Sequence, residues 1–268
     1  MTFYDEHPFD WAPADSPREA DATVPPALAD LIACIEPDSL VLDIGCGPGR
    51  VLSFLRRRGL RCVGVDRSRV SVALAVERCS VPGVVADNLQ LPIATGAADV
   101  VISDGVIHHT DNPQKAFEEN FRVLKPGGQM YVAVYKPSGH YPWLYKYPGE
   151  VIRRGLRRRI TAPLVELFAQ LPYFLAHLVK SHGRRTWTGA RNLFYDYFVS
   201  PHVEFLPRHV VEEWCACRGA EVLRYNENRG LNVHSFIVRK KSSALDLQRN
   251  TQPALTVEML IGENQESP

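Results

Sequence analysis

Val41-Leu42-Asp43-Ile44-Gly45-Cys46-Gly47-Pro48-Gly49-Arg50 is the stretch that decides the fold of this chain. Apolar residues around one aspartate run into glycines at alternate positions, and a segment that suits a helix follows. The pattern predicts a buried strand, a tight turn and the N-terminus of a helix. This arrangement lets the backbone approach a nucleotide-like ligand closely.

The spacing of the glycines helps to distinguish a dinucleotide site from a site for a methionine-like cofactor. It reads G-x-G-x-G, and Arg50 stands where a dinucleotide fingerprint has its third glycine. Asp43 lies two residues before the first glycine, where its carboxylate would repel a pyrophosphate and attract the ammonium group of a methionine-like cofactor. The pattern therefore disfavours a nucleotide-dependent oxidoreductase. The glycines could also form only a tight turn, with Asp43 accepting N–H groups of the loop.

Strand and helix patterns alternate outward from this stretch. The expected strands are 40–44, 61–65, 84–86, 99–103 and 129–135, and the expected helices are 25–35, 50–58, 69–79 and 113–124. A helix at 207–217 and strands at 220–225 and 232–238 follow, and the short link between these strands predicts an antiparallel hairpin. We therefore expect an α/β fold: a doubly wound, mostly parallel, seven-stranded sheet whose last strand is antiparallel.

The chain divides into segments of different character. Residues 1–24 form an N-terminal arm that could act as a lid through Tyr4 or Trp11. The α/β core comprises residues 25–135 and is completed by the last helix and hairpin at 206–240. Residues 136–205 are too long for an ordinary connection and predict a helical, aromatic cap over the substrate. Residues 241–268 are expected to be a flexible tail.

Further segments, in the same order, resemble one family. Val63-Gly64-Val65-Asp66 ends the second strand, Leu89-Gln90-Leu91-Pro92 follows Asp87, and residues 98–109 and 117–128 match a strand, loop, helix and turn. With the glycine stretch, they resemble the class I S-adenosylmethionine-dependent methyltransferases, in particular type 11 and the enzymes of quinone biosynthesis. The resemblance covers residues 38–135 and, more weakly, 207–240. It implies a Rossmann-like fold, S-adenosylmethionine as cofactor, S-adenosylhomocysteine as product, and methyl transfer by in-line displacement.

The same resemblance points to the residues of a cofactor site. Asp66, 17 residues after Gly49, is placed to accept both ribose hydroxyls, as this position does in dehydrogenases. Asp87 and Asn88 supply an acceptor for the adenine amino group, and Leu89 could pack on the ring. The expected cofactor-binding residues are Asp43, Gly45, Cys46, Gly47, Gly49, Asp66, Arg67, Asp87, Asn88, Leu89 and Ser103.

Two adjacent histidines follow the fourth strand, at the edge where ligands of such sheets bind. His108 or His109 could act as a general base for a hydroxyl or amine near neutral pH. Alternatively, a histidine here is structural and satisfies loop backbone. Methyl transfer from a sulfonium requires no metal, and the sequence suggests none.

Aromatic residues of the cap are candidates for substrate binding. Tyr135, Tyr141 and Trp143 follow the fifth strand, and Tyr195 and Asp196 lie in a later aromatic run. The rings could stack on a planar substrate or hold a cation, and Asp196 could orient an amine or hydroxyl. The aromatic residues could equally form the cap's own small core.

Positive charge gathers in the cap. Nine arginines and lysines stand between Val151 and Arg191, against one acid, Glu166. Such a segment could lie on an anionic membrane or hold RNA, but we favour a solvated cap whose apolar face packs on the core. We therefore expect a small-molecule acceptor, plausibly in a biosynthetic pathway. The alternatives are an RNA methyltransferase and a non-catalytic cofactor-binding protein, and the cap or the arm could support a homodimer.

The composition is that of an ordinary globular protein. Hydrophobic residues make up 45% of the 268 residues and charged residues 23%, and the net charge of +1 gives no overall bias toward nucleic acid or membrane. No apolar run reaches the ~20 residues that span a bilayer, and the N-terminus lacks a signal-peptide pattern. The six cysteines form no CxxC pair. Buried thiols in a reducing, cytoplasmic compartment are therefore expected.

Overall fold

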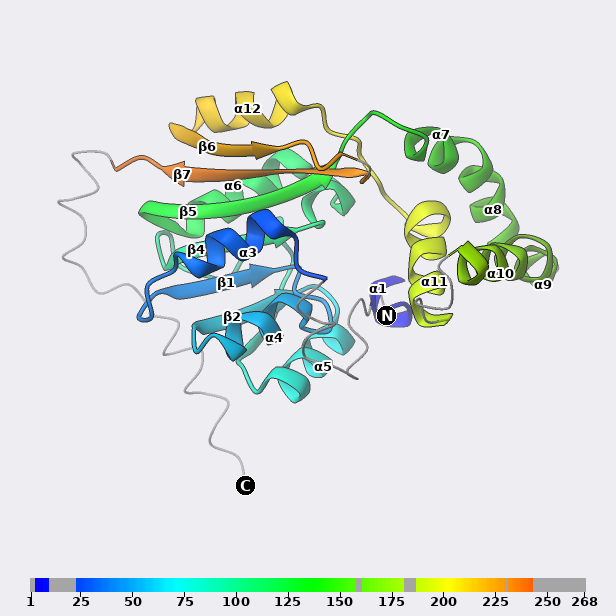
Figure 1. Ribbon diagram of the computed structural model, residues 1–268, viewed down its shortest axis with the longest axis horizontal. Coiled ribbons are helices and arrows are strands. Elements are labelled where there is room, and N and C mark those ends of the chain that lie inside the picture. Colours follow the sequence, from blue (N-terminus) through cyan, green and yellow to red (C-terminus); the bar gives the residue numbers. More distant parts are fainter. Residues whose placement is uncertain (1–2, 10–22, 158–160, 181–186, 230, 243–268) are drawn as a thin grey trace.

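The computed structural model describes residues 3–9, 23–157, 161–180, 187–229 and 231–242. Its centre is a seven-stranded sheet of order β3-β2-β1-β4-β5-β7-β6 (Figure 1). The strands are β1 (Leu40–Ile44), β2 (Arg61–Asp66), β3 (Gly83–Val85), β4 (Ala98–Asp104), β5 (Leu124–Tyr135), β6 (Ala220–Asn226) and β7 (Val233–Lys240). The first five strands are parallel, and β7 is antiparallel to both β5 and β6. The predicted fold class is confirmed.

Helices cover both faces of the sheet (Figure 1). One face carries α3 (Pro26–Ala33), α4 (Arg50–Arg57) and α5 (Arg69–Cys79), and the other carries α6 (Pro113–Val123) and α12 (Arg208–Cys217). The side chain of Ser68 begins α5 by accepting a hydrogen bond from the backbone N–H of Ser71, and Asn112 begins α6 in the same way. The sequence predicted these helices to within two residues at each end.

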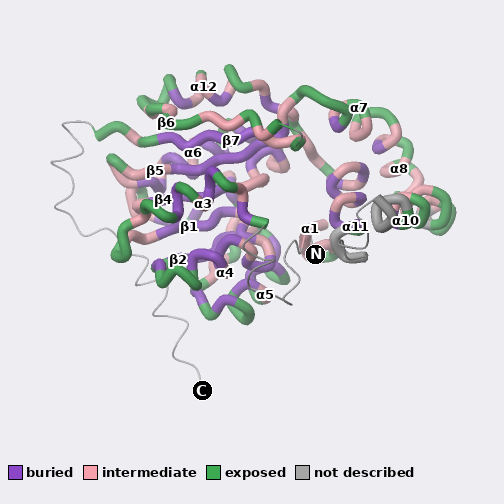
Figure 2. Tube along the Cα trace, in the orientation of Figure 1, coloured by how far each residue is buried: buried purple, intermediate pink, exposed green. Residues whose placement is uncertain are grey.

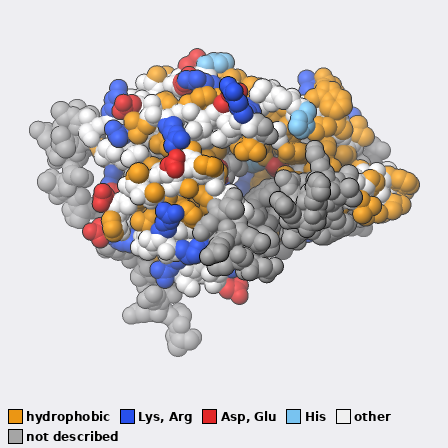
Figure 3. Space-filling model, viewed as in Figure 1, with side chains coloured by type: hydrophobic (Ala, Val, Ile, Leu, Met, Phe, Trp, Pro, Cys, Tyr) orange, Lys and Arg blue, Asp and Glu red, His pale blue; other side chains and the backbone are white. Residues whose placement is uncertain are grey.

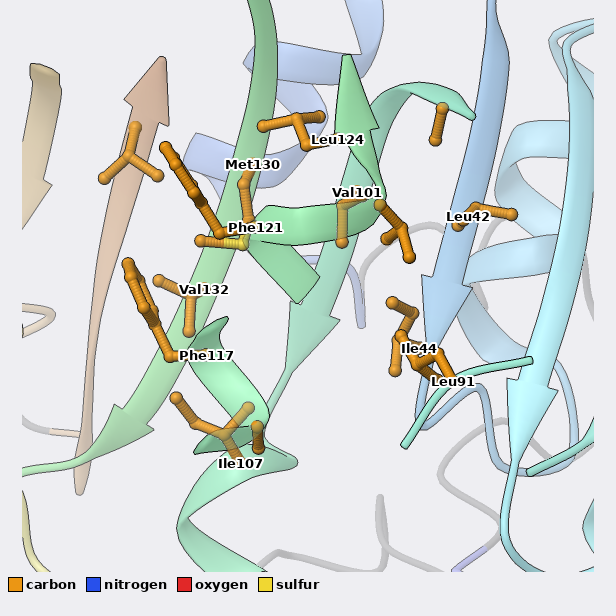
Figure 4. Packing of buried hydrophobic residues seen from close by; sticks show 14 of the residues in the cluster. Leu42, Ile44, Leu91, Val101, Ile107, Phe117, Phe121, Leu124, Met130 and Val132 are labelled. Carbon is orange, nitrogen blue, oxygen red and sulfur yellow. The ribbon is translucent and has the colours of Figure 1, made fainter. Parts of the chain in front are cut away.

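Each face of the sheet has its own apolar core. Side chains alternate along a strand, so Val41 packs against α3 and α4 while its neighbour Leu42 points to the opposite face. On that opposite face, Phe117 and Phe121 of α6 lie against the side chains of Val132 and Met130 of β5 (Figure 4). The central strands are buried from both sides (Figure 2). This packing fixes the strand ends, from which the site is built.

The start of β5 differs from the expectation. Residues 125–128 were expected to be a turn before a strand at 129, but β5 begins at Leu124, which pairs with Ala98. The register then shifts, and Gln129 pairs with Val100. The carboxylate of Asp99 holds this irregular stretch, because it accepts hydrogen bonds from Lys125 Nζ at 2.8 Å and from the backbone N–H of Leu40 at 2.9 Å.

A helical cap follows the last residue of β5, at one end of the sheet (Figure 1). It consists of α7 (Tyr141–Lys146), α8 (Pro148–Leu156), α9 (Ala162–Val165), η2 (Glu166–Gln170), α10 (Leu171–Lys180), α11 (Trp187–Phe194) and η3 (Tyr195–Val199), of which η2 and η3 are π-helical. Phe174, Ala190, Phe194 and Phe198 form a small core of its own. Arg153 donates to the carbonyls of Phe198 and Tyr145, so this arginine is used inside the cap.

Apolar side chains also gather on the outer surface of the cap (Figure 3). Val151 and Phe168 are 71% and 73% exposed. Of the nine basic residues predicted here, Arg158, Arg159, Arg184 and Arg185 lie outside the described residues, as does the side chain of Lys180. In the part of the chain that the structure describes, no helix is both long and apolar enough to cross a membrane.

The cysteines correct one expectation. Four of them are buried as expected, but Cys34 and Cys217 are exposed, and all six are free thiols. Both exposed residues lie at the end of a helix, Cys34 just after α3 and Cys217 as the last residue of α12. At these helix ends the backbone turns away from the core. The apolar sequence pattern therefore includes a residue that the core does not bury.

Candidate functional site

The site lies where the strand order reverses. The chain runs from β1 outward to β2 and β3, then returns to β4 on the other side of β1. The loops after β1 and β4 therefore diverge at their strands' carboxyl ends, where open α/β sheets bind ligands. A cavity of about 410 Å³ occupies this position. The two loops touch at its edge, since a Cβ on Gly45 would lie 2.3 Å from the side chain of Val106.

Most of the residues predicted for the site line this cavity. The structure brings together Asp43, Gly45, Cys46, Gly47, Asp66, Arg67, Asp87, Asn88, His109, Tyr135 and Asp196. The predicted residues that do not line it are Gly49, Leu89, Ser103, His108, Tyr141, Trp143 and Tyr195. Gly49 instead allows close packing of α4 on α5: it has a φ of +94°, and a Cβ there would lie 2.8 Å from the Cys79 sulfur.

Asp43 places a nearly buried carboxylate at the glycine loop. Its side chain is 2% exposed, and within the described residues Oδ2 has no hydrogen-bond partner. Burial raises the pKa of Asp43 to about 7, against the lowering effect of Arg50, and the nearby carboxylates of Asp104 and Asp66 raise it further. A buried carboxylate oxygen without a donor is costly unless a ligand supplies one.

Arg50 and Asp104 form an ion pair that sequence reasoning missed. Arg50 Nη2 lies 2.5 Å from Asp104 Oδ2, and Nη1 donates to the carbonyl of Thr23 at 2.8 Å. All three residues line the cavity. Asp104 is the last residue of β4, one position beyond the predicted Ser103, which is fully buried in the sheet. The sequence could have indicated Asp104, because ligands of open α/β sheets bind at the carboxyl ends of the strands.

Asp66 joins the ends of β1 and β2. One carboxylate oxygen accepts the N–H of Gly47 at 2.9 Å, and the other accepts the N–H of Ser68 at 2.8 Å. Burial raises the pKa of Asp66, and these two hydrogen bonds oppose the rise. Each carboxylate oxygen has a further lone pair, so Asp66 can still accept the two hydroxyls of a ribose.

The neighbouring loop after β3 offers groups for a base. Asp87 Oδ1 accepts the N–H of Leu89 at 2.9 Å. Asn88 is buried, and among the described residues neither its amide nitrogen nor its amide oxygen has a partner. Asn88 therefore has an unused donor and an unused acceptor at the cavity wall, whereas Leu89 packs partly on the apolar core.

The two histidines have different surroundings. His108 is fully buried, and in the described part of the chain its ring nitrogens have no partner. Burial and three nearby histidines hold its pKa well below the usual value, so the ring is neutral. His109 lines the cavity, and its Nδ1 lies 3.0 Å from the carbonyl oxygen of His202. A carbonyl only accepts, so Nδ1 carries the proton and Nε2 presents a lone pair.

Asp196 of η3 faces His109 across the cavity end. Its Oδ1 lies 3.6 Å from His109 Nε2, and Tyr135 donates a hydrogen bond to its Oδ2. Burial raises the pKa of Asp196 to about 7, and burial lowers the pKa of His109 to about 4. Both shifts favour uncharged side chains before a ligand binds.

The other predicted substrate residues lie behind or beside this end. Tyr141 is fully buried, and its hydroxyl donates to the carbonyl of Asp196 at 2.8 Å, so it supports the cavity wall from behind. Tyr195 packs against His7, with ring centroids 4.2 Å apart. Trp143 is 59% exposed on the outside of the cap. Their predicted contact with substrate stays a prediction.

The N-terminal segment closes one side of the cavity. Tyr4, Pro8 and Phe9 line it, and the short helix α1 (Phe3–Glu6) is held to the core because Ser68 Oγ donates to the carboxylate of Asp5 at 2.8 Å. The hydroxyl of Tyr4 is buried and, among the described residues, has no partner. The sequence suggested Tyr4 and Trp11 as lid residues; Trp11 lies outside the described residues.

Comparison with known proteins agrees with this geometry. Residues 42–132 match the family model described as a methyltransferase domain. These residues form a class I methyltransferase domain. Its fold neighbours include an S-adenosylmethionine-dependent methyltransferase from Methanosarcina mazei (TM-score 0.52, 15% identity, covering 82% of this chain and 99% of that one). Another is magnesium protoporphyrin IX methyltransferase from Synechocystis with bound S-adenosylhomocysteine (TM-score 0.51, 14% identity, covering 84% and 82%). The names of both neighbours agree with the cofactor expected from the sequence, S-adenosylmethionine.

The match to one sequence relative covers less than half of this chain. The tRNA (carboxymethyluridine(34)-5-O)-methyltransferase of Mus musculus is 34% identical over 119 residues, which is 43% of this chain. The matched stretch spans 18% of the length of that relative. More than half of this chain therefore lies outside that match.

The residues present fit the cofactor. The unpartnered oxygen of Asp43 suits the ammonium group of its methionine part. Asp66 has free lone pairs for the ribose diol, and Asn88 has an unused donor and acceptor for the adenine edge. Within the described residues, no group of three or more His, Cys, Asp or Glu side chains is placed to hold a metal ion.

Proposed function

We propose that this protein transfers the methyl group of S-adenosylmethionine to a small-molecule acceptor that binds beside His109 and Asp196. One observation carries the proposal: a single cavity is lined by the predicted cofactor residues at the ends of β1, β2 and β3 and by Asp196 of the cap. A donor and an acceptor bound at its two ends would lie in one cavity. When bound, the cofactor supplies an activated methyl group on a sulfonium.

The protein's contribution is alignment. The glycine loop and Asp43 fix the amino-acid end of the cofactor, and Asp66 fixes the ribose. His109 and Asp196 hold the acceptor's nucleophilic atom at the other end. The N-terminal segment covers the site and keeps water out. Holding both reactants in line is worth several kcal/mol of the barrier, typically about 7–11 kcal/mol for well-oriented pairs.

The charges of the cavity support a small molecule over RNA. The lining contains five acids, Asp43, Asp66, Asp87, Asp104 and Asp196, and two arginines, Arg50 and Arg67. Arg50 is already paired with Asp104. A phosphate backbone entering this space would meet net negative charge, which opposes binding.

The first test is calorimetric titration with S-adenosylhomocysteine, run beside NAD. We expect micromolar binding of the first ligand and none of the second. Asp66→Ala should abolish the binding because the ribose loses its acceptor, whereas His109→Ala should keep it because this ring lies at the acceptor end. If Asp66→Ala binds S-adenosylhomocysteine as tightly as the wild type, the ribose does not bind at the end of β2.

The acceptor class needs a second test. The protein is incubated with methyl-tritiated S-adenosylmethionine and either the small-molecule fraction or total RNA of a bacterial extract. Label is expected in the small-molecule fraction. Label in RNA, together with RNA binding that weakens steeply as salt is added, would instead establish an RNA methyltransferase. Cofactor binding without any label transfer would indicate a non-catalytic protein.

A further inference from the structure

The acceptor end of the cavity has an unusual combination of groups. It holds one nearly buried carboxylate, Asp196, which is 5% exposed, and aromatic rings from three separate elements. Tyr4 comes from α1, His109 from the turn after β4, and Tyr135 from the end of β5. Among the described residues that line this cavity, the positive side chains are Arg50, the first residue of α4, and Arg67, which follows β2 and lies 5.9 Å from the centre of the Tyr4 ring.

The two polar groups at this end are spaced for a third atom. Asp196 Oδ1 and His109 Nε2 are 3.6 Å apart, which is too far for a direct hydrogen bond. One nitrogen or oxygen atom at about 2.8 Å from each would bridge them. His109 Nδ1 is fixed on the carbonyl of His202, so Nε2 accepts and does not donate. When Asp196 is ionised, both protein groups accept hydrogen bonds, so the atom that bridges the ionised pair must carry hydrogens.

From this geometry we infer that the acceptor is an amine, bound as an ammonium ion between Asp196 and His109 and methylated on nitrogen. The inference rests on the proposed function and narrows it to a substrate class. An ammonium group can donate to both acceptors at once and is attracted by the faces of the surrounding aromatic rings. A carboxylate acceptor would meet the charge of Asp196, and a hydroxyl has only one hydrogen to donate.

The chemistry balances with these residues. Asp196 takes one proton from the ammonium, which turns two buried charges into two neutral groups. The nitrogen lone pair then forms a bond to the methyl carbon while the carbon–sulfur bond breaks and its electron pair goes to sulfur. The product nitrogen carries the positive charge again, next to Asp196. The Tyr135 hydroxyl, which donates to Oδ2, holds the carboxylate in place throughout.

The experiment compares three probes that share a phenyl-ethyl or phenyl-methyl frame: phenethylamine, 2-phenylethanol and phenylacetate. Their binding to the protein loaded with S-adenosylhomocysteine is measured by ligand-observed NMR. Phenethylamine should bind at least tenfold more tightly than either other probe. Asp196→Asn should abolish this preference, and Asp111→Asn, which removes the same charge from an exposed site just beyond His109, should keep it.

Several results would overturn the inference: equal binding of the alcohol or the carboxylate, no binding of the amine, or a preference that survives in Asp196→Asn. Binding of S-adenosylhomocysteine is measured first in each sample. A protein that does not bind S-adenosylhomocysteine would contradict the proposed function, whereas the inference that the acceptor is an amine is tested only in samples that bind it.

A pH series on the unmodified protein keeps the test decisive if Asp196→Asn fails to fold. Phenethylamine stays protonated below about pH 9, as lysine does. Its affinity should fall as pH drops below about 7, because Asp196, whose pKa burial raises to about 7, becomes neutral. The titratable groups that face Asp196 are His109, Tyr135, Tyr4 and Tyr141; His109 has a pKa of about 4, and burial raises the pKa of each tyrosine. A flat profile between pH 5 and pH 8 would contradict the proposal.

Discussion

Gly45 and Gly59 share a backbone conformation but differ in their surroundings. Their φ angles are +77° and +72°, in the left-handed region that favours glycine. A Cβ on Gly45 would lie 2.3 Å from Val106, whereas a Cβ on Gly59 would meet nothing within 4 Å. Gly59→Ala should therefore cost only the backbone strain, about 1–2 kcal/mol, and leave S-adenosylhomocysteine binding intact.

Gly45→Ala should destabilise the protein more than Gly59→Ala and also weaken binding, because Val106 must move at the cavity edge. Urea unfolding gives the first quantity and calorimetry the second. Equal effects of the two substitutions would show that the loops after β1 and β4 are not in contact.

Asp43 gives the protein a defined pH dependence. Its pKa rises from 3.8 to about 7 on folding, so between about pH 4 and pH 7 the folded protein keeps a proton that the unfolded chain has released. The unfolding free energy therefore falls as pH rises through this window. Asp43→Asn removes the ionisation, so the apo variant should be more stable than the wild type at pH 8, by at most about 4 kcal/mol, and about equally stable at pH 4.

The comparison isolates Asp43 because Asp196, which burial affects in the same direction, is present in both proteins. The same variant should bind S-adenosylhomocysteine more weakly, since its ammonium group loses a charged partner. A variant that is less stable than the wild type at pH 8 would mean that Asp43 is ionised and paired in the folded apo protein.

At the scale of elements, the sequence determines most of the sheet because each strand is a short apolar run between helices of clear period. Its limits appear where a contact between distant segments decides the structure. Leu124 joins β5 because Ala98 pairs with it, which the run Lys125-Pro126-Gly127-Gly128 does not reveal. Glycine spacing and strand ends placed Asp43, Asp66 and Asp87 at one edge of the sheet.

The other half of the site could not be placed in the same way. Arg50 and Asp104 meet across 54 positions of sequence, and Asp196 reaches His109 only through the packing of the cap. The aromatic residues at the end of β5 and in the cap could not be told apart in the sequence. Tyr135 lines the cavity, whereas Tyr141 lies behind its wall.

The cap has an apolar core separate from the two cores of the sheet. A substitution in the cap core should therefore destabilise the cap without destabilising the sheet. Phe194 is 1% exposed inside the cap, and Phe117 is fully buried against the sheet. Either substitution to alanine removes a similar volume and should cost about 3–5 kcal/mol in the unit it belongs to. Phe194→Ala should increase hydrogen exchange in α10, α11 and η3 while β1, β4 and the binding of S-adenosylhomocysteine stay unchanged.

Phe117→Ala provides the contrast, because it should lower the unfolding midpoint of the whole sheet. Increased exchange of β1 and β4 in Phe194→Ala would mean that cap and sheet unfold as one unit.

At the scale of the whole molecule, the N-terminal helix connects the core and the cap. It is tied to the core by the hydrogen bond from Ser68 to Asp5 and to the cap by His7, whose Nδ1 lies 3.2 Å from Arg191 Nη2 (Figure 1). Tyr4, between these two ties, lines the cavity. We therefore expect a ligand in the cavity to leave past this segment.

Asp5→Ala should therefore speed the release of S-adenosylhomocysteine, because it removes the shorter of the two hydrogen bonds that Ser68 Oγ makes to α1 and leaves the one to the Tyr4 carbonyl at 3.2 Å. We expect the dissociation rate, measured by stopped-flow displacement, to rise several-fold, as the loss of one charge-assisted hydrogen bond of about 1.5–3 kcal/mol allows. Glu6→Ala removes the same charge from an exposed neighbouring position and should leave the rate unchanged. If both variants release the ligand at the wild-type rate, the N-terminal helix does not control exit, and the cavity must open on the side of the cap.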